Sequence, residues 1–351
     1  MTAGLIALVL LLAVAAYACA GGTDYGAGFW DLVAGGAERG KRPRWLIDHA
    51  MSPVWEVNNV WLIFVLVIMW TGFPTFFQTV FSAMWLPLAL AAVGMVLRGA
   101  SFAFRKAARR LARQRLLGAL FALSSLVTPF FLGAAAGGIA SGRAAPGTEP
   151  EAHIWVNPTS LLFGLLAVTA TAFLGAVFLA GDARRFDAPD LVGYFRARAL
   201  AALGAVAVLA VITLFVTRTD APYVWHGLTH GVGLVFTLVA GVATCATAWL
   251  LTRTPGLPVR AGAVAVVAGA VLAWGLAQRP YLIPTSLTVA DAAGAPSTLT
   301  WLVFVTLVAL VLVGPAVFLL YWLDTHGELE ELTDADLGRG GPEPGGTTGG
   351  G

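Results

Sequence analysis

Hydrophobic residues in this chain form long runs separated by short polar connections, a pattern typical of helices that cross a membrane. The hydrocarbon core of a bilayer is about 30 Å thick and a helix rises about 1.5 Å per residue, so one crossing needs about 20 apolar residues. Runs of that length predict an all-α fold with about nine membrane-spanning helices. Their approximate limits are 4–24, 56–77, 80–101, 116–138, 158–180, 199–217, 228–251, 261–277 and 299–322.

Composition supports the same class of protein. The chain has 351 residues, of which 58% are hydrophobic and 11% are charged, whereas soluble domains have about 25% charged residues. We therefore expect a polytopic membrane protein with one transmembrane domain over residues 1–326. Residues 327–351 are acidic and then rich in glycine and proline, which predicts a disordered tail. No nucleic-acid partner is expected.

The basic residues are distributed unequally between the two sides of the predicted bundle. Eighteen of the 21 fall in alternate connections and in the tail, and the other three are Arg143, Arg218 and Arg279. Because lysine and arginine in short loops stay on the cytoplasmic side, the N-terminus is predicted outside and the C-terminus in the cytoplasm. The basic connection 36–55 is partly amphipathic, so its Trp45, Leu46 and Ile47 are expected in the membrane interface.

The most informative departure from the apolar pattern lies between Ser52 and Arg105. Glu56, Asn58 and Asn59 stand at the head of the second apolar run. An unpaired polar group costs several kcal/mol inside a bilayer, so such residues usually have a buried partner or a function. They indicate a proton path, a ligand site or a contact with another chain.

The same region carries motifs that resemble those of subunit II of the cytochrome bd quinol oxidases. That family has a Pro-Val-Trp-acid-x-Asn segment, a following Phe-Pro, a Leu-Arg-Gly…Phe-x-Phe-Arg stretch, a Gly-x-Asp-Phe/Tyr-Gly setting in its first helix and a Pro-Tyr-Leu-x-Pro stretch before its last helix. The corresponding residues here are Pro53-Val54-Trp55-Glu56-Val57-Asn58, Phe73-Pro74, Leu97-Arg98-Gly99 with Phe102-Ala103-Phe104-Arg105, Thr23-Asp24-Tyr25-Gly26 and Pro280-Tyr281-Leu282-Ile283-Pro284.

The resemblance implies an accessory subunit of a terminal respiratory oxidase in the bacterial cytoplasmic membrane. It implies a partner, subunit I, that carries haems b and d, oxidises quinol and reduces oxygen. This chain would supply a large apolar interface and part of a cytoplasmic proton route, with no catalytic residue of its own. A structural quinone or lipid, and a small accessory subunit, are further partners that such a complex could include.

Two acidic residues are the candidates for the proton path. Asp24 lies near the cytoplasmic end of the first span, and a carboxyl group there suits proton relay; the alternative is a structural carboxylate bound to backbone or loop arginines. Glu56 occupies the acid position of the second-helix motif, where it would take up protons or, alternatively, stabilise the first turn of the helix. Asn59 and Ala103 stand where the family commonly has glutamates, which puts any route through those acids in doubt.

Several other residues are expected to support this site. Asn58 is expected to bridge helices by hydrogen bonds. Trp55 and Trp61 are mostly expected to anchor the helix in the interface, with contact to a cofactor as the alternative. Arg98 and Arg105 could pair with Glu56 or Asp24, although cytoplasmic anchoring by positive charge explains both residues adequately.

Histidines give little sign of a haem or metal site in this chain. A haem needs an axial His, Met or Cys ligand, and only His226 and His230 have ligand spacing, four positions apart on one predicted helix. Their place at the outer edge of a span makes an interfacial polar cluster the preferred interpretation.

Two other classes of protein compete with the oxidase subunit. In a proton- or cation-coupled secondary transporter, the acids and the asparagine pair would bind substrate near a broken helix. The predicted polar cluster lies at the cytoplasmic edge rather than at the membrane midplane, which disfavours this class. The third class is a membrane scaffold with neither transport nor redox function.

Overall fold

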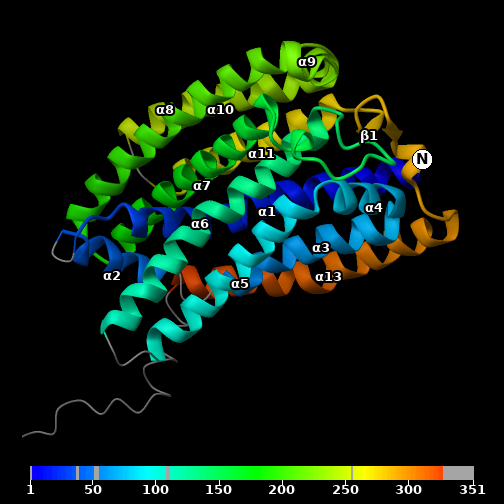
Figure 1. The fold of residues 1–351 in the computed structure, drawn as a ribbon. Coiled ribbons are helices and arrows are strands. Elements are labelled where there is room, and N and C mark those ends of the chain that lie inside the picture. The colour runs from blue at the N-terminus through cyan, green and yellow to red at the C-terminus, as the bar shows by residue number, and fades with distance from the viewer. Residues whose placement is uncertain (1, 37–38, 51–54, 108–110, 254–255, 327–351) are drawn as a thin grey trace, which may run out of the picture. The chain divides into compact units, whose positions relative to one another are not determined.

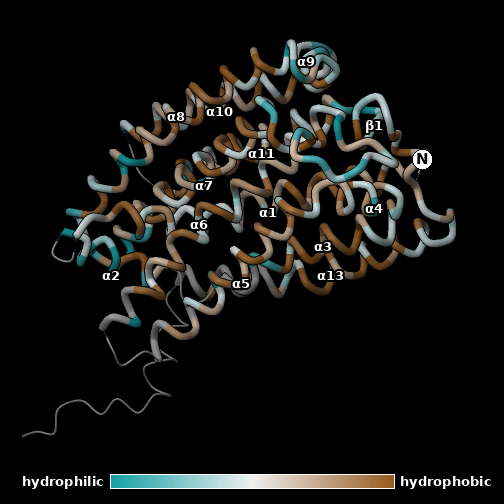
Figure 2. The backbone as a smooth tube through the Cα atoms, in the orientation of Figure 1, coloured by the Kyte–Doolittle hydropathy of each residue, from teal (hydrophilic) through white to brown (hydrophobic). Residues whose placement is uncertain are grey.

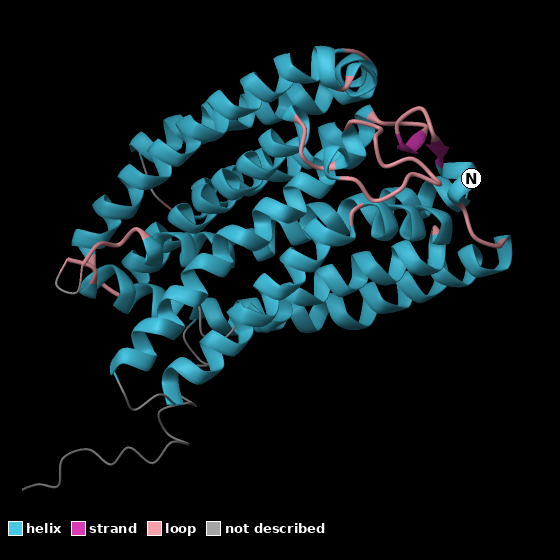
Figure 3. Ribbon diagram, viewed as in Figure 1, coloured by secondary structure: helices cyan, strands magenta, loops and turns pink. Residues whose placement is uncertain are grey.

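The computed structural model describes residues 2–36, 39–50, 55–107, 111–253 and 256–326. The predicted tail, 327–351, lies outside these residues. Almost all of the described chain is helical, with one short hairpin (Figure 3). The helices are α1 (Thr2–Leu32), α2 (Lys41–Ala50), α3 (Trp55–Gly72), α4 (Pro74–Ala83), α5 (Trp85–Ala107), α6 (Leu111–Ala140), α7 (Pro158–Arg185), α8 (Pro189–Asp220), α9 (Pro222–Thr229), α10 (Gly231–Arg253), α11 (Leu257–Ala277), α12 (Val289–Ala292) and α13 (Pro296–His326).

Seven of these helices are long and apolar enough to cross a membrane, which makes the chain a polytopic all-α membrane protein. They are α1, α7, α8, α10, α11 and parts of α6 and α13. Hydrophobic residues cover the helices and polar residues gather in the connections (Figure 2). The chain divides into two compact units, Met1–Val303 and Phe304–Gly351, and the candidate site lies entirely in the first.

The second predicted span does not continue straight to residue 77. Helix α3 ends at Gly72, and the axis turns by 116° into α4. Pro74 occupies the start of α4, where its missing N–H costs no hydrogen bond and its fixed φ suits a helix. The third predicted span, 80–101, correspondingly begins later, because α4 fills residues 74–83 and α5 starts at Trp85.

Helix α1 is longer than predicted and lies between α3 and α7 (Figure 1). Gly26 and Gly175 let α1 and α7 approach closely, since a Cβ atom on Gly26 would lie 1.9 Å from the carbonyl oxygen of Thr171. Small residues at such crossings bring helix backbones together in membranes. The Gly26-x-Gly28 spacing therefore serves helix packing.

Two apolar clusters flank α1. One joins the C-terminal part of α1 to α2, α7, α8 and α11, and the other joins its N-terminal part to α3, α4 and the hairpin. Leu46 and Ile47 of α2 are almost fully buried in the first cluster, so their side chains pack against protein and do not face lipid. Trp45, on the other face of α2, is 39% exposed.

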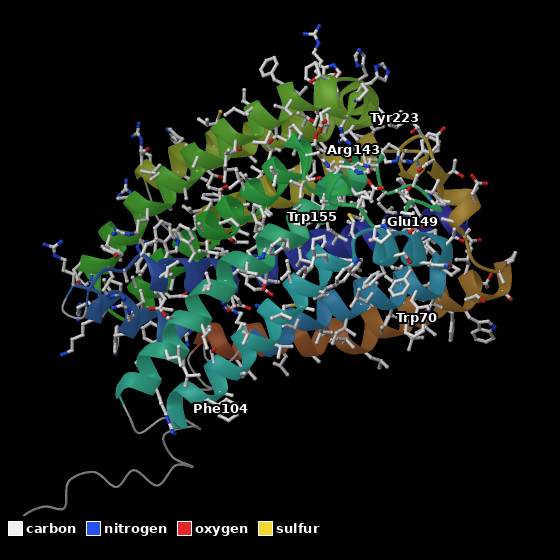
Figure 4. The ribbon with its side chains drawn as sticks, viewed as in Figure 1. Trp70, Phe104, Arg143, Glu149, Trp155 and Tyr223 are labelled. Carbon is white, nitrogen blue, oxygen red and sulfur yellow. The ribbon has the colours of Figure 1, made fainter. Side chains whose placement is uncertain are left out.

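The Asp220 carboxylate links the loops on the predicted outer side to one another. Asp220 at the end of α8 binds Arg143 at 2.6 Å and accepts hydrogen bonds from the Thr159 amide and hydroxyl at the start of α7. The hairpin pairs β1 (Tyr281–Ile283) with β2 (Leu287–Thr288). Arg143, Glu149 and Tyr223 gather at this end, and Phe104 lies at the opposite end (Figure 4). The Arg143–Asp220 ion pair thus lies at the end of the bundle opposite to Phe104.

Candidate functional site

Asp24 and Asn58 form the centre of the candidate site. The Asn58 amide Nδ2 on α3 donates a hydrogen bond of 2.8 Å to Asp24 Oδ2 on α1. Asn58 is only 3% exposed, so this bond lies inside the bundle. The polar residues that the apolar pattern made conspicuous are thus brought together across two helices.

Arg98 of α5 joins the same cluster from a third helix. Its Nη2 donates to the backbone carbonyl oxygen of Asp24 at 2.7 Å, and its Nη1 donates to the Ser125 hydroxyl on α6. The guanidinium carbon lies 4.9 Å from the ring centre of Tyr25 and 4.4 Å from that of Phe121. Arg98 is 6% exposed, so anchoring at the cytoplasmic surface does not explain it. Its charge is instead compensated inside the protein by acceptors and aromatic faces.

Gly28 makes room for this arginine. A Cβ atom at Gly28 would lie 2.0 Å from Ser125 Oγ and 2.9 Å from Arg98 Nη1. Any larger residue would displace either the Ser125 hydroxyl or the Arg98 guanidinium group, so the site requires glycine at position 28.

A cavity of about 200 Å³ adjoins the cluster between α1, α3 and α5. Its polar walls are formed by Tyr25, Asn59 and Arg98, and its apolar walls by Leu62, Ile63, Met95 and Gly99. Asn59 therefore lies beside the cluster although it differs from the acid common in the family.

Sequence reasoning missed four members of this site. Tyr17 and Tyr25 on α1 place their hydroxyl oxygens 3.2 Å apart, and Ser125 and Phe121 on α6 surround Arg98. Tyr25 could have been found, because it belongs to the Thr23-Asp24-Tyr25-Gly26 motif. The other three lie in ordinary apolar sequence and gave no signal.

The remaining predicted site residues are placed less fully. The side chains of Trp55, Glu56 and Arg105 lie outside the described residues, although α3 begins at Trp55 and so includes position 56. Trp61 is half-buried on α3, one turn beyond Asn58. The cluster that can be described therefore consists of Asp24, Asn58 and Arg98 with their neighbours.

His226 and His230 do not form a ligand pair on one helix. Helix α9 ends at Thr229, the two imidazole rings stack 4.3 Å apart, and His230 Nδ1 lies 3.1 Å from the His226 carbonyl oxygen. Within the described ranges, no group of three or more His, Cys, Asp or Glu residues could hold a metal ion. The two histidines therefore do not belong to a three-ligand metal site in the described part of the chain.

The fold and the site define a polytopic helical membrane protein in which a half-buried acid contacts a buried amide and a buried arginine. The model of the family "Cytochrome bd terminal oxidase subunit II" matches residues 2–324, and the chain belongs to this family. It is thus the non-catalytic subunit II of a quinol oxidase, an oxidoreductase of the respiratory chain. The match favours this class over the secondary transporter.

Known relatives agree with the family along most of the chain. A putative cytochrome bd menaquinol oxidase subunit II of Bacillus subtilis is 23% identical over 322 residues, which cover 87% of this chain and 90% of the relative. A cytochrome bd ubiquinol oxidase subunit 2 of the same organism is 27% identical over 112 residues, 32% of each chain. The structure of bd oxidase from Geobacillus thermodenitrificans superimposes with a TM-score of 0.78 at 26% identity, covering 92% of this chain and 98% of that chain.

Proposed function

We propose that this subunit carries protons from the cytoplasm toward the oxygen-reducing site through Glu56 and Asp24. The observation that supports the proposal most is the Asp24–Asn58–Arg98 cluster. In it the Asp24 carboxyl group on α1 accepts a hydrogen bond from Asn58 on α3, and Arg98 on α5 binds the Asp24 carbonyl. Buried ionisable residues in membrane helices commonly serve proton or ion paths.

The surroundings of Asp24 allow its carboxyl group to change protonation state. The side chain is half-buried, and the Asn58 amide donates a hydrogen bond of 2.8 Å to its Oδ2. The terminal nitrogens of Arg98 bind the Asp24 carbonyl and the Ser125 hydroxyl. Asp24 Oδ2 is thus held by a neutral donor, which suits a group that gains and loses protons in turn.

Glu56 is proposed to take up protons at the cytoplasmic side. It belongs to the first turn of α3, two positions before Asn58, and the basic connection before it is predicted to be cytoplasmic. Asn59 and Ala103 carry no acid, so the route proposed here passes from Glu56 to Asp24 without them. Asn59 contributes an amide to the wall of the cavity instead.

The proposed topology has nine spans, with the N-terminus outside and the C-terminus in the bacterial cytoplasm. It adds α3 and α5 to the seven long apolar helices. The sharp turn at Phe73 divides Asn58–Gly72 of α3 from Pro74–Ala83, and the shorter apolar helix Trp85–Ser101 of α5 follows. Residues 1–326 would then form the transmembrane domain, and residues 327–351 a disordered cytoplasmic tail.

The proposed partner is subunit I, which would hold haems b and d and oxidise quinol. Exposed apolar side chains along α3 and α5, among them Val60, Ile63, Val67, Val93 and Val96, could be covered by such a partner or by lipid. A small accessory subunit and a structural quinone or lipid would complete the complex. The reaction chemistry belongs to the partner, and the residues of this chain hold and move protons.

Replacing Asp24 by Asn tests the proton path. The amide cannot relay a proton, so quinol-driven oxygen uptake by the purified complex should fall by about 100-fold, as for loss of a proton-transfer group. The haem content and the ratio of the subunits should stay unchanged. Asp190→Asn is the matched control, because Asp190 forms an exposed ion pair with Arg42 on α2 and its replacement should leave the rate unchanged. An active Asp24→Asn complex, or one that fails to assemble, would refute the proton role.

A further inference from the structure

The hydroxyl groups of Tyr17 and Tyr25 are in contact, although the two residues lie more than two turns apart on α1. The two residues are eight positions apart on α1, about 12 Å along the axis, yet their oxygens are 3.2 Å apart. The Tyr17 ring reaches this contact by lying over Gly21, where a Cβ atom would be 2.9 Å from Tyr17 Cε2. Gly21 therefore keeps open the path along which the two rings converge.

One member of the tyrosine pair, Tyr25, lines the same cavity as Arg98 of the Asp24 cluster. Tyr25 lines the cavity and lies over the Arg98 guanidinium, and the Tyr17 hydroxyl is 4.0 Å from the sulfur atom of Met95, another lining residue. The polar groups thus continue from Asp24 along α1 toward Tyr17.

Most of the cavity wall is apolar, but the side formed by Tyr25, Asn59 and Arg98 can hold water. Its volume is about 200 Å³, and a water molecule occupies about 30 Å³ of liquid, so it has room for about six molecules. The Asn59 amide, the Arg98 guanidinium and the Tyr25 hydroxyl supply donors and acceptors in its wall. At its rim, Ile63 is 59% exposed, so the cavity reaches the surface that α3 presents to its neighbours.

We propose that Tyr25 and Tyr17 are the next two members of the proton path after Asp24. Arg98 joins Asp24 to the wall of this cavity, and water at the polar side of the cavity completes the connection. The inference rests on the proposed proton role of Asp24. At each hydroxyl the oxygen accepts an incoming proton while its own proton passes on, so that one O–H bond forms as another breaks. Neither ring keeps a charge, and the protons are consumed when the oxidase reduces oxygen to water.

Tyrosine-to-phenylalanine variants of the whole complex test this inference, since they keep the rings and remove only the hydroxyls. Tyr25→Phe and Tyr17→Phe should each lower quinol-driven oxygen uptake by about tenfold or more, as expected when a proton-transfer group is lost. The ratio of rates in H₂O and D₂O should rise, because proton delivery becomes rate-limiting. A purely structural hydroxyl would leave that ratio unchanged.

Tyr194→Phe is the matched control. Tyr194 lies on α8 with its ring 3.2 Å from the guanidinium carbon of Arg198, away from the cavity, so its variant should keep the wild-type rate and isotope ratio. If Tyr25→Phe fails to assemble, Tyr17→Phe decides, because it leaves both the ring and the hydroxyl group of Tyr25 beside Arg98. Wild-type behaviour of the tyrosine variants beside a slow Asp24→Asn complex would overturn this inference alone, whereas a fast Asp24→Asn complex would overturn the proposed function as well.

Discussion

Arg98 is the residue on which the site depends most. A guanidinium group inside a membrane bundle is costly unless acceptors compensate it. Here the compensation comes from two other helices: the Asp24 carbonyl and the Tyr25 ring on α1, and the Ser125 hydroxyl and the Phe121 ring on α6. The arginine therefore fixes α1, α5 and α6 to one another around the carboxyl group.

Gly28→Ala should weaken this arrangement. The added methyl group would meet Ser125 Oγ and Arg98 Nη1, and overpacking of this kind costs about 1–3 kcal/mol. We expect the complex to lose activity at a lower temperature than the wild type, measured as residual oxygen uptake after heating. Gly204→Ala is the control, because its Cβ would meet no atom within 4 Å. Equal stability of the Gly28 and Gly204 variants would contradict the close packing at Arg98.

The sequence predicted the polar core of the site but not its surroundings. Asp24, Asn58 and Arg98 are conspicuous because each is polar within apolar sequence, and they also belong to the motifs of the family. Ser125 and Tyr17 are unremarkable in sequence, since hydroxyl-bearing residues are common in membrane helices. Only the contacts in the structure, Tyr17 with Tyr25 and Ser125 with Arg98, show that they adjoin the cluster.

At the scale of elements, the turn between α3 and α4 positions the site by ending α3 at Gly72. Phe73 is fully buried at this turn, and the Gly72 carbonyl accepts a hydrogen bond of 2.9 Å from the Gly294 amide. The end of α3 is thus fastened to the connection between α12 and α13. This contact holds the helix that carries Asn58.

Phe73→Ala should therefore destabilise the subunit. Truncating a fully buried phenylalanine costs about 3–5 kcal/mol, and the thermal midpoint of the purified complex should fall. Phe215→Ala on α8 is the matched control, since Phe215 is 62% exposed and its truncation should have little effect. A midpoint that falls equally in both variants would show that Phe73 does not hold the turn.

Hydropathy located the helices but missed how some of them end. It could not show that α1 continues to Leu32, because Asp24 and Asp31 interrupt the apolar run. In the structure Asp31 forms an ion pair of 2.9 Å with Arg44 of α2, so its charge is compensated within the helix pair. The burial of Leu46 and Ile47 was also missed. A short amphipathic helix has the same sequence pattern whether its apolar face packs against lipid or against protein.

At the scale of the whole molecule, the proposed direction of proton flow requires the proposed orientation in the membrane. The basic residues predict which side is cytoplasmic, and the Asp24 cluster lies in the part of α1 nearer that side. The loops that the Arg143–Asp220 ion pair links would then face outward. An inverted subunit would draw its protons from the wrong compartment.

Single cysteines report this orientation. In a chain without Cys245, the exposed native thiol, Glu149→Cys should react with a membrane-impermeant maleimide in intact cells. Arg113→Cys on α6 should react only after the cells are permeabilised, because its side is predicted to be cytoplasmic. The reverse pattern of labelling would invert the proposed topology.

Single-turnover proton uptake by the Asp24→Asn complex tests the central claim most directly. The fully reduced complex is mixed with oxygen, and a pH-sensitive dye in the medium is followed together with haem oxidation. The account predicts that the wild type takes up protons as its haems are oxidised, whereas the variant binds oxygen normally but takes up protons about 100-fold more slowly. Proton uptake at the wild-type rate in the variant would show that protons do not reach the oxidase through Asp24.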